Sequence, residues 1–498
     1  MIRQLQAGVL AAGLVFANTI PSAGAGWPVF GYDPARSGVD GSRRILTVRN
    51  VVRLRSRWQI SLGAIADSTP ILLEHIKAGG ISRTMLFQTA TNGVTFGIDA
   101  QSGQILWRFR TRGTSLRTGG VLGFLRNAVF GPSVTTSTPA ADPAGRSIYA
   151  PGLDGFVHKL DAATGTELIG RGFPVRITLI PQTEKDASAL NLANGYLYAT
   201  TSGYNGDAPP YVGHVISVRL ADGSTTVFNS LCGRDRRLPT PTSCPHSGSG
   251  IWSRGGVVVD PDASMHGRIY VATGDGDFDA DSGGDDYGDS VLALNPALTK
   301  LVGRYTPADY GALSHHDVDL GSTSPAILPR QPASRTPLML IQGGKDSVLK
   351  LVNRSPLPGV AGELQRLDLV APLFSTPAVW TERSNRVWIF MGFPQEVDGY
   401  RLDTDALGES RLVRIWRAAP GKTSEEGTSP VVSNGIVFDA FDGAIFALDA
   451  RNGHELWNSR LQSAGRTIGP VHWQSPIVVN GWVYCSDQNG DLTAYALH

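Results

Sequence analysis

Short apolar runs of strand length alternate with polar turns along almost the whole chain. Each unit of this pattern opens with a Ser/Thr-Pro or Gly-Pro turn and a first strand, followed by a second strand such as IYVATG (269–274). A tight turn leads to a third strand that ends in Leu-Asp-Ala or an equivalent. A Gly turn then leads to a fourth strand that often ends in Trp. Strand-length runs bounded by such turns are typical of antiparallel hairpins.

This unit is an internal repeat. Its clearest copies are GVTFGIDAQSGQILWRF (93–109), GFVHKLDAATGTEL (155–168) and GAIFALDARNGHELWNSRL (443–461). Five weaker copies bring the number to eight, at 214–228, 290–305, 347–357, 397–416 and 490–497. The spacing between copies is about 46 to 74 residues. Four strands per unit at this period predict a β-propeller, in which each unit forms one radially placed sheet.

The two ends of the chain predict how the propeller closes. The last copy stops after its third strand, at Leu497-His498, and a matching outer strand occurs at the start, at 54–62. Trp58 of that strand occupies the position that Trp107, Trp416 and Trp457 have in complete units, and we interpret all four as packing residues between blades. We therefore expect an all-β, eight-bladed β-propeller of four-stranded antiparallel blades, closed by pairing of 54–62 with 492–497.

The N-terminus has the pattern of a secretory signal peptide. Arg3 precedes a short apolar run, Ala7–Ile20, and Ala23-Gly24-Ala25 forms a cleavage motif before Gly26. We interpret residues 1–25 as a signal peptide and residues 26–498 as a single propeller domain. The alternative is an uncleaved membrane anchor. The first interpretation predicts a periplasmic or secreted protein with no membrane span after cleavage.

Composition and cysteine content narrow the class of protein. Lys and Arg number 44 and Asp and Glu 43, for a net charge of +1, so no basic surface argues for a nucleic-acid partner. Export would allow a disulfide between Cys232 and Cys244, which lie in a polar insertion at 231–250. The third cysteine, Cys485, lies in the apolar run WVYCS and is expected to be a buried free thiol.

Candidate chemistry gathers between residues 251 and 345. Trp252 precedes the IYVATG strand, and seven Asp lie in the loop between Asp275 and Asp289. Asp317 and Asp319 follow in HHDVD, and Lys345 comes directly after the strand-like run LMLIQGG. Carboxylates, an aromatic ring and a cation thus fall at strand ends, where loops carry function on a rigid scaffold.

The repeat G-x-I/L-x-A-L-D-A-x-x-G-x-x-L-W resembles that of the pyrroloquinoline quinone (PQQ) β-propeller superfamily, across essentially the whole mature chain. That superfamily includes quinoprotein alcohol dehydrogenases, polyvinyl-alcohol-dehydrogenase-like enzymes and the non-enzymatic outer-membrane assembly scaffold BamB. The resemblance implies the propeller fold and leaves open which of these functions applies.

Several motifs resemble the dehydrogenases. ATGDG places Asp275 at the calcium-binding position of a G-T-G-N turn, and HHDVD places Asp317 at the catalytic Asp. Lys345 matches a cofactor-contacting Arg or Lys, Trp252 a stacking Trp, and Asn205 in SGYNG a calcium-binding Glu. The resemblance therefore implies Asn205, Asp275 and Asp317 as metal ligands, Trp252 and Lys345 as cofactor contacts, and Asp317 as catalytic base. The chain departs from the family in exchanging Glu and Asn and in lacking an adjacent Cys-Cys pair.

These residue types suit the implied chemistry. PQQ is planar and polyanionic, so an indole can stack on it and Lys or Arg can hold its carboxylates. Calcium takes hard oxygen ligands and acts as a Lewis acid, and a carboxylate can accept an alcohol proton. We therefore expect a PQQ- and calcium-dependent alcohol or polyol dehydrogenase. It would act on a small or polymeric alcohol with an external electron acceptor. The alternative is a non-enzymatic propeller that binds protein or carbohydrate.

Each candidate residue also has a structural interpretation. Asp317 and Asp319 could be solvated loop residues, Trp252 could pack a blade, and Lys345 could be an exposed turn lysine. The alternating Asp277, Asp279 and Asp281 could form a separate calcium loop or a solvated acidic loop.

Overall fold

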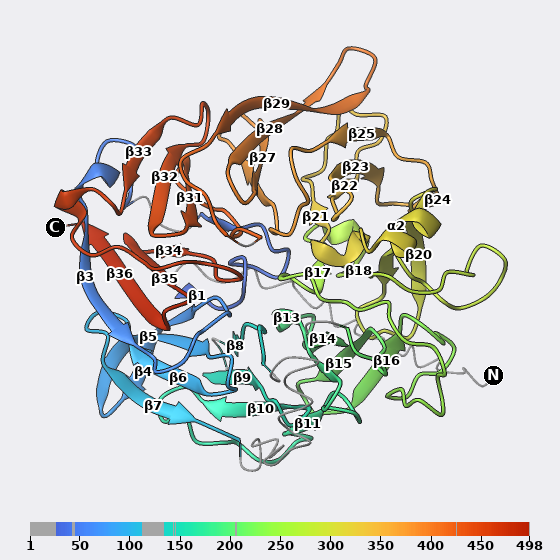
Figure 1. Ribbon diagram of the computed structural model, residues 1–498, viewed down its shortest axis with the longest axis horizontal. Coiled ribbons are helices and arrows are strands. Elements are labelled where there is room, and N and C mark those ends of the chain that lie inside the picture. Colours follow the sequence, from blue (N-terminus) through green and yellow to red (C-terminus); the bar gives the residue numbers. More distant parts are fainter. Residues whose placement is uncertain are drawn as a thin grey trace, which may run out of the picture.

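Eight sheets, antiparallel except for one parallel pair in each of two sheets, stand around a central axis in the computed structural model, which describes residues 26–41, 45–111, 134–142, 144, 146–204, 207–424 and 426–497 (Figure 1). We number the sheets as blades 1 to 8 in chain order. The predicted eight-bladed propeller is confirmed. The predicted signal peptide, residues 1–25, lies outside the described residues.

The first four blades follow the expected order of strands. Blade 1 consists of β4 (Ile71–Ala78), β5 (Ile81–Thr89), β6 (Thr95–Asp99) and β7 (Ile105–Phe109), and blade 2 of β8 (Ala140–Asp142), β9 (Ser147–Pro151), β10 (Phe156–Asp161) and β11 (Val175–Arg176). Blade 3 consists of β12 (Glu184–Asp186), β13 (Asn191–Ala193), β14 (Tyr196–Gly203), β15 (His214–Arg219) and β16 (Thr225–Asn229). Blade 4 consists of β17 (Val258–Val259), β18 (Ile269–Ala272), β19 (Val291–Leu294) and β20 (Leu301–Thr306).

The other four blades repeat the arrangement. Blade 5 consists of β21 (Ala326–Ile327), β22 (Met339–Gln342), β23 (Val348–Asn353) and β25 (Gln365–Asp368), and blade 6 of β26 (Ala378–Thr381), β27 (Val387–Gly392), β28 (Val397–Thr404) and β29 (Ser410–Ala418). Blade 7 consists of β30 (Val431–Ser433), β31 (Ile436–Phe441), β32 (Ala444–Asp449) and β33 (Glu455–Asn458). Blade 8 consists of β34 (Ile477–Val479), β35 (Trp482–Ser486), β36 (Asp491–Leu497) and β3 (Leu54–Ser61).

Four of the sheets have five strands where four were expected. The additional strands are β1 (Gly26–Trp27) on blade 1, β13 within blade 3, β24 (Gly359–Val360) on blade 4 and β2 (Val39–Asp40) on blade 7. Short helical segments lie in the loops: α2 (Tyr310–His316), η1 (Val51–Arg53), η2 (Ala263–Met265), η3 (Leu320–Ser322) and η4 (Gln462–Ala464).

The N-terminal strand closes the last blade, as predicted. Strand β3 pairs antiparallel with β36, from Leu54 opposite Leu497 to Ser61 opposite Asp491. Both strands lie side by side at the rim, near the C-terminus (Figure 1). The pairing joins the two ends of the chain in one sheet and removes two free sheet edges.

The repeated tryptophans pack between neighbouring blades, which confirms their structural interpretation. The indole N–H groups of Trp58, Trp107 and Trp416 donate to the carbonyls of Ala100, Ala162 and Ala450 in the next blade, at 3.1, 3.0 and 2.9 Å. Each accepting Ala follows the Asp that ends a third strand of the repeat. The indole of Trp107 lies over Gly97, where an added Cβ would be 2.1 Å from the ring, so this position requires glycine.

Trp457 is the exception among the four. It is buried, but its indole N–H has no hydrogen-bond partner among the described residues. Its neighbour is blade 8, in which Leu497 of β36 stands where the other three units have the accepting Ala, and Leu497 pairs with Leu54 of β3.

Residues 26–40, which we call the N-terminal hub, lie among the inner strands of six blades. Strand β1 pairs with β4 of blade 1 and β2 with β30 of blade 7. Backbone carbonyls of the hub accept N–H groups of Ala141, Val259 and Val379 in blades 2, 4 and 6, and of Asn191 in blade 3. The hub thus fastens the blades to one another along the axis.

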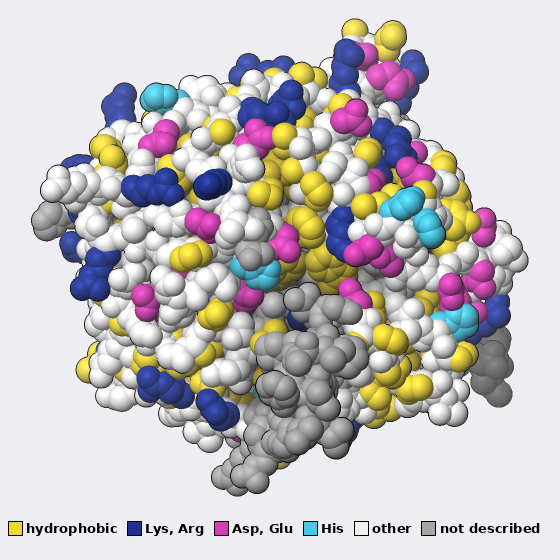
Figure 2. Space-filling model, in the orientation of Figure 1, with side chains coloured by type: hydrophobic (Ala, Val, Ile, Leu, Met, Phe, Trp, Pro, Cys, Tyr) yellow, Lys and Arg dark blue, Asp and Glu magenta, His cyan; other side chains and the backbone are white. Residues whose placement is uncertain are grey.

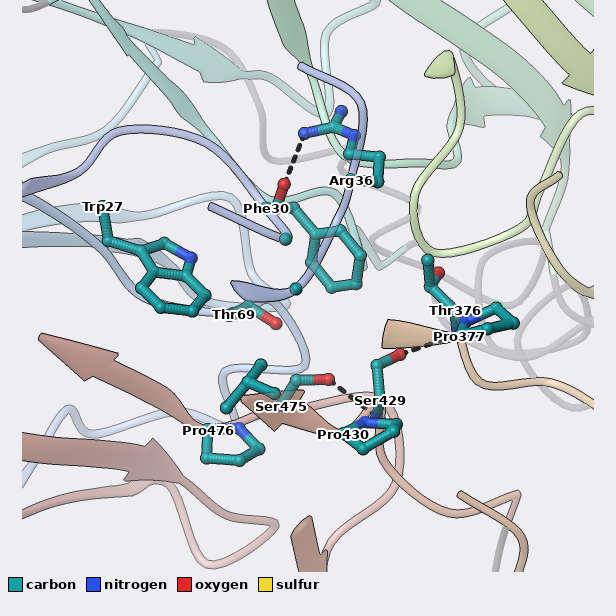
Figure 3. Close-up of a pocket in the computed structure, with 13 residues that line it drawn as sticks. Trp27, Phe30, Arg36, Thr69, Thr376, Pro377, Ser429, Pro430, Ser475 and Pro476 are labelled. Atoms are coloured by element: carbon teal, nitrogen blue, oxygen red, sulfur yellow. Dashed lines mark hydrogen bonds between the residues drawn. The ribbon is translucent and has the colours of Figure 1, made fainter. Parts of the chain in front are cut away.

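Arg36 is a buried arginine of this hub that links it to two blades. Its guanidinium is 2% exposed, and all three nitrogens donate to backbone carbonyls: those of Phe30, Gly255, Ala189 and Leu190, at 2.7 to 3.1 Å. Figure 3 shows Arg36, Phe30 and Trp27 around a small pocket whose other walls are Ser/Thr-Pro turns of blades 1, 6, 7 and 8. The hub therefore lies against the first-strand turns of the blades.

The cysteine predictions are also confirmed. Cys232 and Cys244 form a disulfide with a Cα–Cα distance of 5.9 Å, and Cys485 is a buried free thiol. The disulfide loop packs on the acidic loop, because the Cys232 N–H donates to Asp286 Oδ1 at 2.6 Å and the Gly233 N–H to the Asp285 carbonyl at 3.0 Å.

Candidate functional site

Three carboxylates from two loops of the propeller meet at one point. Asp275 lies in the loop after β18, and Asp317 and Asp319 lie between α2 and β21. Ligand atoms of the three side chains all lie within 4.8 Å of one another. Two of the three, Asp275 and Asp317, are residues that the sequence predicted as metal ligands.

A short helix that the sequence pattern did not predict positions two of these carboxylates. Helix α2 ends at Asp317, which has a left-handed backbone (φ 52°) and donates its N–H to the Leu313 carbonyl. The chain then runs into η3, where the Leu320 N–H donates to Asp289 Oδ1 at 2.9 Å. This turn leaves the Asp317 side chain 76% exposed and buries Asp319 to 2%.

Lys345 holds the two aspartates of this turn. Its ammonium lies 2.5 Å from Asp317 Oδ1 and 2.8 Å from Asp319 Oδ1, and its backbone N–H donates to the Asp319 carbonyl at 3.0 Å. Burial lowers the pKa of Lys345, but the charges of Asp319 and Asp317 and their hydrogen bonds raise it more, so the net shift is upward. Lys345 is therefore a cation at neutral pH, bound to the carboxylate cluster.

Trp252 completes the group of predicted residues. Its indole N–H donates to Asp319 Oδ2 at 2.9 Å, and the Lys345 ammonium lies 5.1 Å from its ring centroid. The ring is nearly parallel to that of Trp473, with centroids 6.0 Å apart. Trp252, Asp275, Asp317 and Lys345, four of the five residues for which the resemblance implies a role, thus lie close together. Asn205, the fifth, lies outside the described residues.

The cluster carries more negative charge than Lys345 balances. Burial first, and then the charges of Asp319 and Asp289, raise the pKa of Asp275 to about 8. Burial likewise raises the pKa of Asp289 to about 7. Asp275 Oδ1 and Asp289 Oδ2 are buried and have no hydrogen-bond partner among the described residues. Crowded, under-coordinated carboxylate oxygens are the ligand type that hard cations such as calcium require, so the residues present fit a metal ion.

A second polar group lies around Trp473. His472 bridges two carboxylates, with Nδ1 2.8 Å from Asp67 Oδ2 and Nε2 2.9 Å from Glu426 Oε2. Burial lowers the pKa of His472, but these two partners raise it more, to about 9. Arg254 stacks over the Trp473 ring at 4.2 Å and donates from Nη2 to the His472 carbonyl at 3.0 Å. Blades 1, 4, 7 and 8 thus contribute to this group.

The search for site residues in the sequence missed this second group, although it contained a signal. Asp67, Glu426 and His472 stand two to four positions before the Ser or Thr-Pro that opens a blade, and Asp319 stands slightly further ahead of such a turn. Positions just before first strands therefore contribute charged side chains to this group from several blades. Acidic and basic side chains border the hollow at the centre of the face in Figure 2.

The acidic loop does not gather its alternating aspartates. Asp279 Oδ1 accepts the backbone N–H of Asp286 at 2.9 Å, and Asp277 Oδ2 lies 2.6 Å from Nδ1 of the exposed His246. Among the described residues, the possible metal-binding groups are Asp275 with Asp317 and Asp319, and His246 with Asp277 and Asp286. Asp277, Asp279 and Asp281, for which a separate calcium loop and a solvated acidic loop were the alternatives, do not form one of these groups together.

Comparisons with known proteins agree with the repeat. The family model for the outer membrane protein assembly factor BamB matches residues 413–498. No curated protein sequence matches the chain. The resemblance to the PQQ-repeat β-propeller superfamily is confirmed.

Solved structures show the same fold at low sequence identity. A quinohemoprotein alcohol dehydrogenase from Pseudomonas putida is 14% identical, with a TM-score of 0.66 over 95% of this chain and 80% of that one. A europium-containing methanol dehydrogenase is also 14% identical, with a TM-score of 0.66 over 95% and 98% of the two chains. BamB from Moraxella catarrhalis is 13% identical, with a TM-score of 0.52 over 89% and 99%.

In the part of the chain that the structure describes, no helix has both the length and the apolar character needed to cross a membrane.

Proposed function

We propose that this protein is an oxidoreductase that binds PQQ and a metal ion and oxidises an alcohol or polyol. The observation that carries the proposal is the meeting of Trp252, Lys345 and three carboxylates from two loops of the propeller. Both dehydrogenases named above have this fold, although at 14% identity the fold is all that the likeness conveys.

The residues divide into a metal half and a cofactor half. Asp275, Asp317 and Asp319 would hold the metal ion, and Trp252 and Lys345 would contact the planar, anionic cofactor. PQQ, when bound, supplies the two-electron acceptor that no amino-acid side chain provides. Calcium is the expected ion. The three carboxylates also suit a trivalent ion such as the europium of the methanol dehydrogenase.

Asp317 is the residue best placed to move a proton. Its side chain is 76% exposed, whereas Asp319 is buried and bound by both Lys345 and Trp252. A substrate alcohol can therefore reach Asp317, which would accept the hydroxyl proton as hydride leaves the carbon. Asp319 would instead hold Lys345 and Trp252 in position.

The compartment and partners follow from this activity. An external electron acceptor must reoxidise the cofactor, and the substrate is a small or polymeric alcohol. The Cys232–Cys244 disulfide supports a periplasmic or secreted protein, because such bonds persist in oxidising compartments.

The deciding experiment is a calorimetric and absorbance titration of the purified, metal-free protein with PQQ, in the presence of calcium or of lanthanum. We expect saturable binding that requires one of the two ions. Asp317→Asn should abolish turnover and leave PQQ affinity nearly unchanged. Trp252→Ala should weaken binding by about 1–3 kcal/mol, by analogy with aromatic stacking on bases. Trp380→Ala, at a partly buried tryptophan of blade 6, is the matched control. Absence of PQQ binding with either ion would refute the proposal.

A non-enzymatic scaffold is the second candidate, and the BamB family match at 413–498 favours it. In that case the axial carboxylates would bind a metal without PQQ, and the protein would act by binding protein or carbohydrate. The same titration separates the two functions.

A further inference from the structure

A histidine and two aspartates meet where the disulfide loop packs on the acidic loop. His246 lies in the disulfide loop, and Asp277 and Asp286 lie in the acidic loop. His246 Nδ1 is 2.6 Å from Asp277 Oδ2 and 3.7 Å from Asp286 Oδ2. One ligand atom from each of the three side chains lies within 4.8 Å of the other two. None of these residues belongs to the candidate site, so they form a separate group of possible metal ligands.

Asp286 is the member of the group that needs a positive partner. Its side chain is only 10% exposed, and its Oδ1 accepts the Cys232 N–H at 2.6 Å. Its Oδ2 accepts no hydrogen bond from the residues that the structure describes and lies nearest to His246 Nδ1. That nitrogen makes its own hydrogen bond to Asp277. A buried carboxylate oxygen without a donor is costly unless a cation neutralises it.

The disulfide holds the ligands in place before any ion binds. Cys244 lies two residues before His246, and its disulfide partner Cys232 donates to Asp286. On the acidic loop, Asp279 Oδ1 accepts the Asp286 N–H at 2.9 Å. A covalent bond and backbone hydrogen bonds thus fix both segments, so an ion would bind with little loss of conformational entropy.

The donor set indicates which ion fits. One imidazole nitrogen and two carboxylate oxygens are ligands of zinc and similar divalent ions, whereas calcium takes oxygen ligands and takes more of them. A tetrahedral ion with bonds of about 2.0–2.1 Å separates its ligand atoms by about 3.3 Å. The separations of 2.6 and 3.7 Å from His246 Nδ1 lie on either side of that value. The His246 and Asp277 side chains are 40% and 67% exposed, so an ion can enter and a water can complete its coordination.

We propose that His246 Nδ1, Asp277 Oδ2 and Asp286 Oδ2 bind a zinc-type divalent ion that joins the disulfide loop to the acidic loop. The ion takes the place of the hydrogen between His246 and Asp277 and supplies the positive charge that Asp286 Oδ2 lacks. The Ser249 N–H donates to the Asp275 carbonyl, so the joined segments include the one that carries Asp275 of the candidate site. The inference does not rest on the proposed function, because the two sites share no residue.

The test is a calorimetric titration of the full-length, metal-free protein with Zn²⁺, in the presence and absence of excess calcium. His246→Gln and Asp277→Asn each remove one ligand from an exposed position. His454→Gln, at an exposed histidine beside β33, is the matched control. Asp275→Asn removes a carboxylate of the other possible metal-binding group and shows whether Zn²⁺ binds there instead.

We expect Zn²⁺ to bind at one site from which calcium does not displace it. His246→Gln and Asp277→Asn should each weaken this binding by more than about 100-fold, because the loss of an outer-shell partner alone costs about 10- to 100-fold. His454→Gln and Asp275→Asn should retain it. Co²⁺ should give the visible absorption bands of a four-coordinate ion in wild type, and His246→Gln should lack them.

Several outcomes would overturn the proposal. Zn²⁺ binding that is equal in His246→Gln and wild type, or that is lost in Asp275→Asn, would place the ion elsewhere. Absence of Zn²⁺ binding, or its displacement by calcium at equal concentration, would also overturn it. Thermal unfolding is the second measurement, because both ligand variants should unfold like wild type without metal. Zn²⁺ should raise the unfolding temperature of wild type and His454→Gln, and should leave that of His246→Gln unchanged.

Discussion

Among the described residues three arginines are buried, and two regions of the molecule treat them differently. In the scaffold, every guanidinium nitrogen of Arg36 and Arg354 donates a hydrogen bond, and Arg354 also pairs with Asp260 at 2.7 and 3.1 Å. In the candidate site, two nitrogens of Arg254 and one carboxylate oxygen each of Asp275 and Asp289 have no hydrogen-bond partner in the part of the chain that the structure describes. The same buried charge is thus closed off where it holds blades together and left open where we propose that a ligand binds.

This difference in hydrogen bonding indicates that the buried charges stabilise the fold in the scaffold and destabilise it in the candidate site. Removing one partner of a fully paired buried charge destabilises the protein. A buried charge with unsatisfied hydrogen-bonding groups instead lowers the stability of the folded state itself. Substitutions that remove a buried charge should therefore lower the free energy of unfolding in the scaffold, and should leave it unchanged or raise it in the candidate site.

The largest effect is expected at the N-terminal hub. Arg36→Met removes four hydrogen bonds, three of which join the hub to blades 3 and 4 and one of which lies within the hub, and we expect a loss of more than about 5 kcal/mol in the free energy of unfolding. Denaturant unfolding measures it, with the exposed Arg335→Met as control, for which we expect about 0.5 kcal/mol or less. If Arg36→Met and Arg335→Met were equally stable, the hydrogen bonds of Arg36 would not stabilise the fold, and the comparison would not hold for the hub.

A matched pair of Asp→Asn substitutions tests the opposite signs directly. Asp260→Asn breaks the buried pair with Arg354 and should cost about 3–5 kcal/mol. Asp275→Asn removes one of several crowded carboxylates and should leave the metal-free protein as stable or more stable. Thermal unfolding of both variants with and without calcium is the measurement. If Asp275→Asn lost as much stability as Asp260→Asn in the absence of metal, Asp275 would be a paired residue of the scaffold and not an unsatisfied carboxylate of a ligand site.

His472 tests whether a fully paired charge within the candidate site stabilises the fold, as the paired charges of the scaffold do. Its pKa is raised to about 9 by Asp67 and Glu426 against the effect of burial. The stabilisation should therefore be complete below about pH 6.5 and be lost as pH rises through 9. His472→Gln should cost on the order of 2–3 kcal/mol at pH 6 and much less at pH 10. Unfolding measured over this pH range checks the sign, with the exposed His454→Gln as control. A constant difference at all pH values would contradict the charged bridge.

The smallest expected effect is a difference in stability between substitutions of two scaffold tryptophans, Trp416 and Trp457. Trp416→Phe removes an indole N–H that donates to Ala450 at 2.9 Å, whereas Trp457→Phe removes one with no partner. Since the change in ring size is the same, Trp416→Phe should cost about 1 kcal/mol more. Denaturant midpoints give the difference, and equal costs would show that the hydrogen bond contributes nothing measurable.

Repetition explains why so much of the fold could be predicted from the sequence. Eight copies of one unit indicate eight blades, and the unmatched strand with Trp58 pointed to the closure by β3. The hub has no such pattern, because its two strands have two residues each and its contacts come from six different blades. Helix α2 is a single seven-residue insertion, which no repeat foreshadows.

The candidate site divides in a similar way. The sequence analysis could single out Trp252, Asp275, Asp317 and Lys345, because they lie in motifs that resemble those of the dehydrogenases. Arg254 and His472 stand alone in the sequence, and their significance comes from partners that lie far away along the chain. Their roles become visible only when the blades bring those partners together.

The pairing of β3 with β36 has a consequence for the order in which the protein folds. During synthesis from the N-terminus, residues 54–61 have no partner until the last residues of the chain are available. Pairing over such a distance along the chain carries a large entropic cost and is slow. Until it occurs, β3 remains a free strand edge that could pair with another chain. We therefore expect the ring to resist aggregation only once β3 has paired with β36, and we expect an interruption of the chain before residue 491 to leave that edge open.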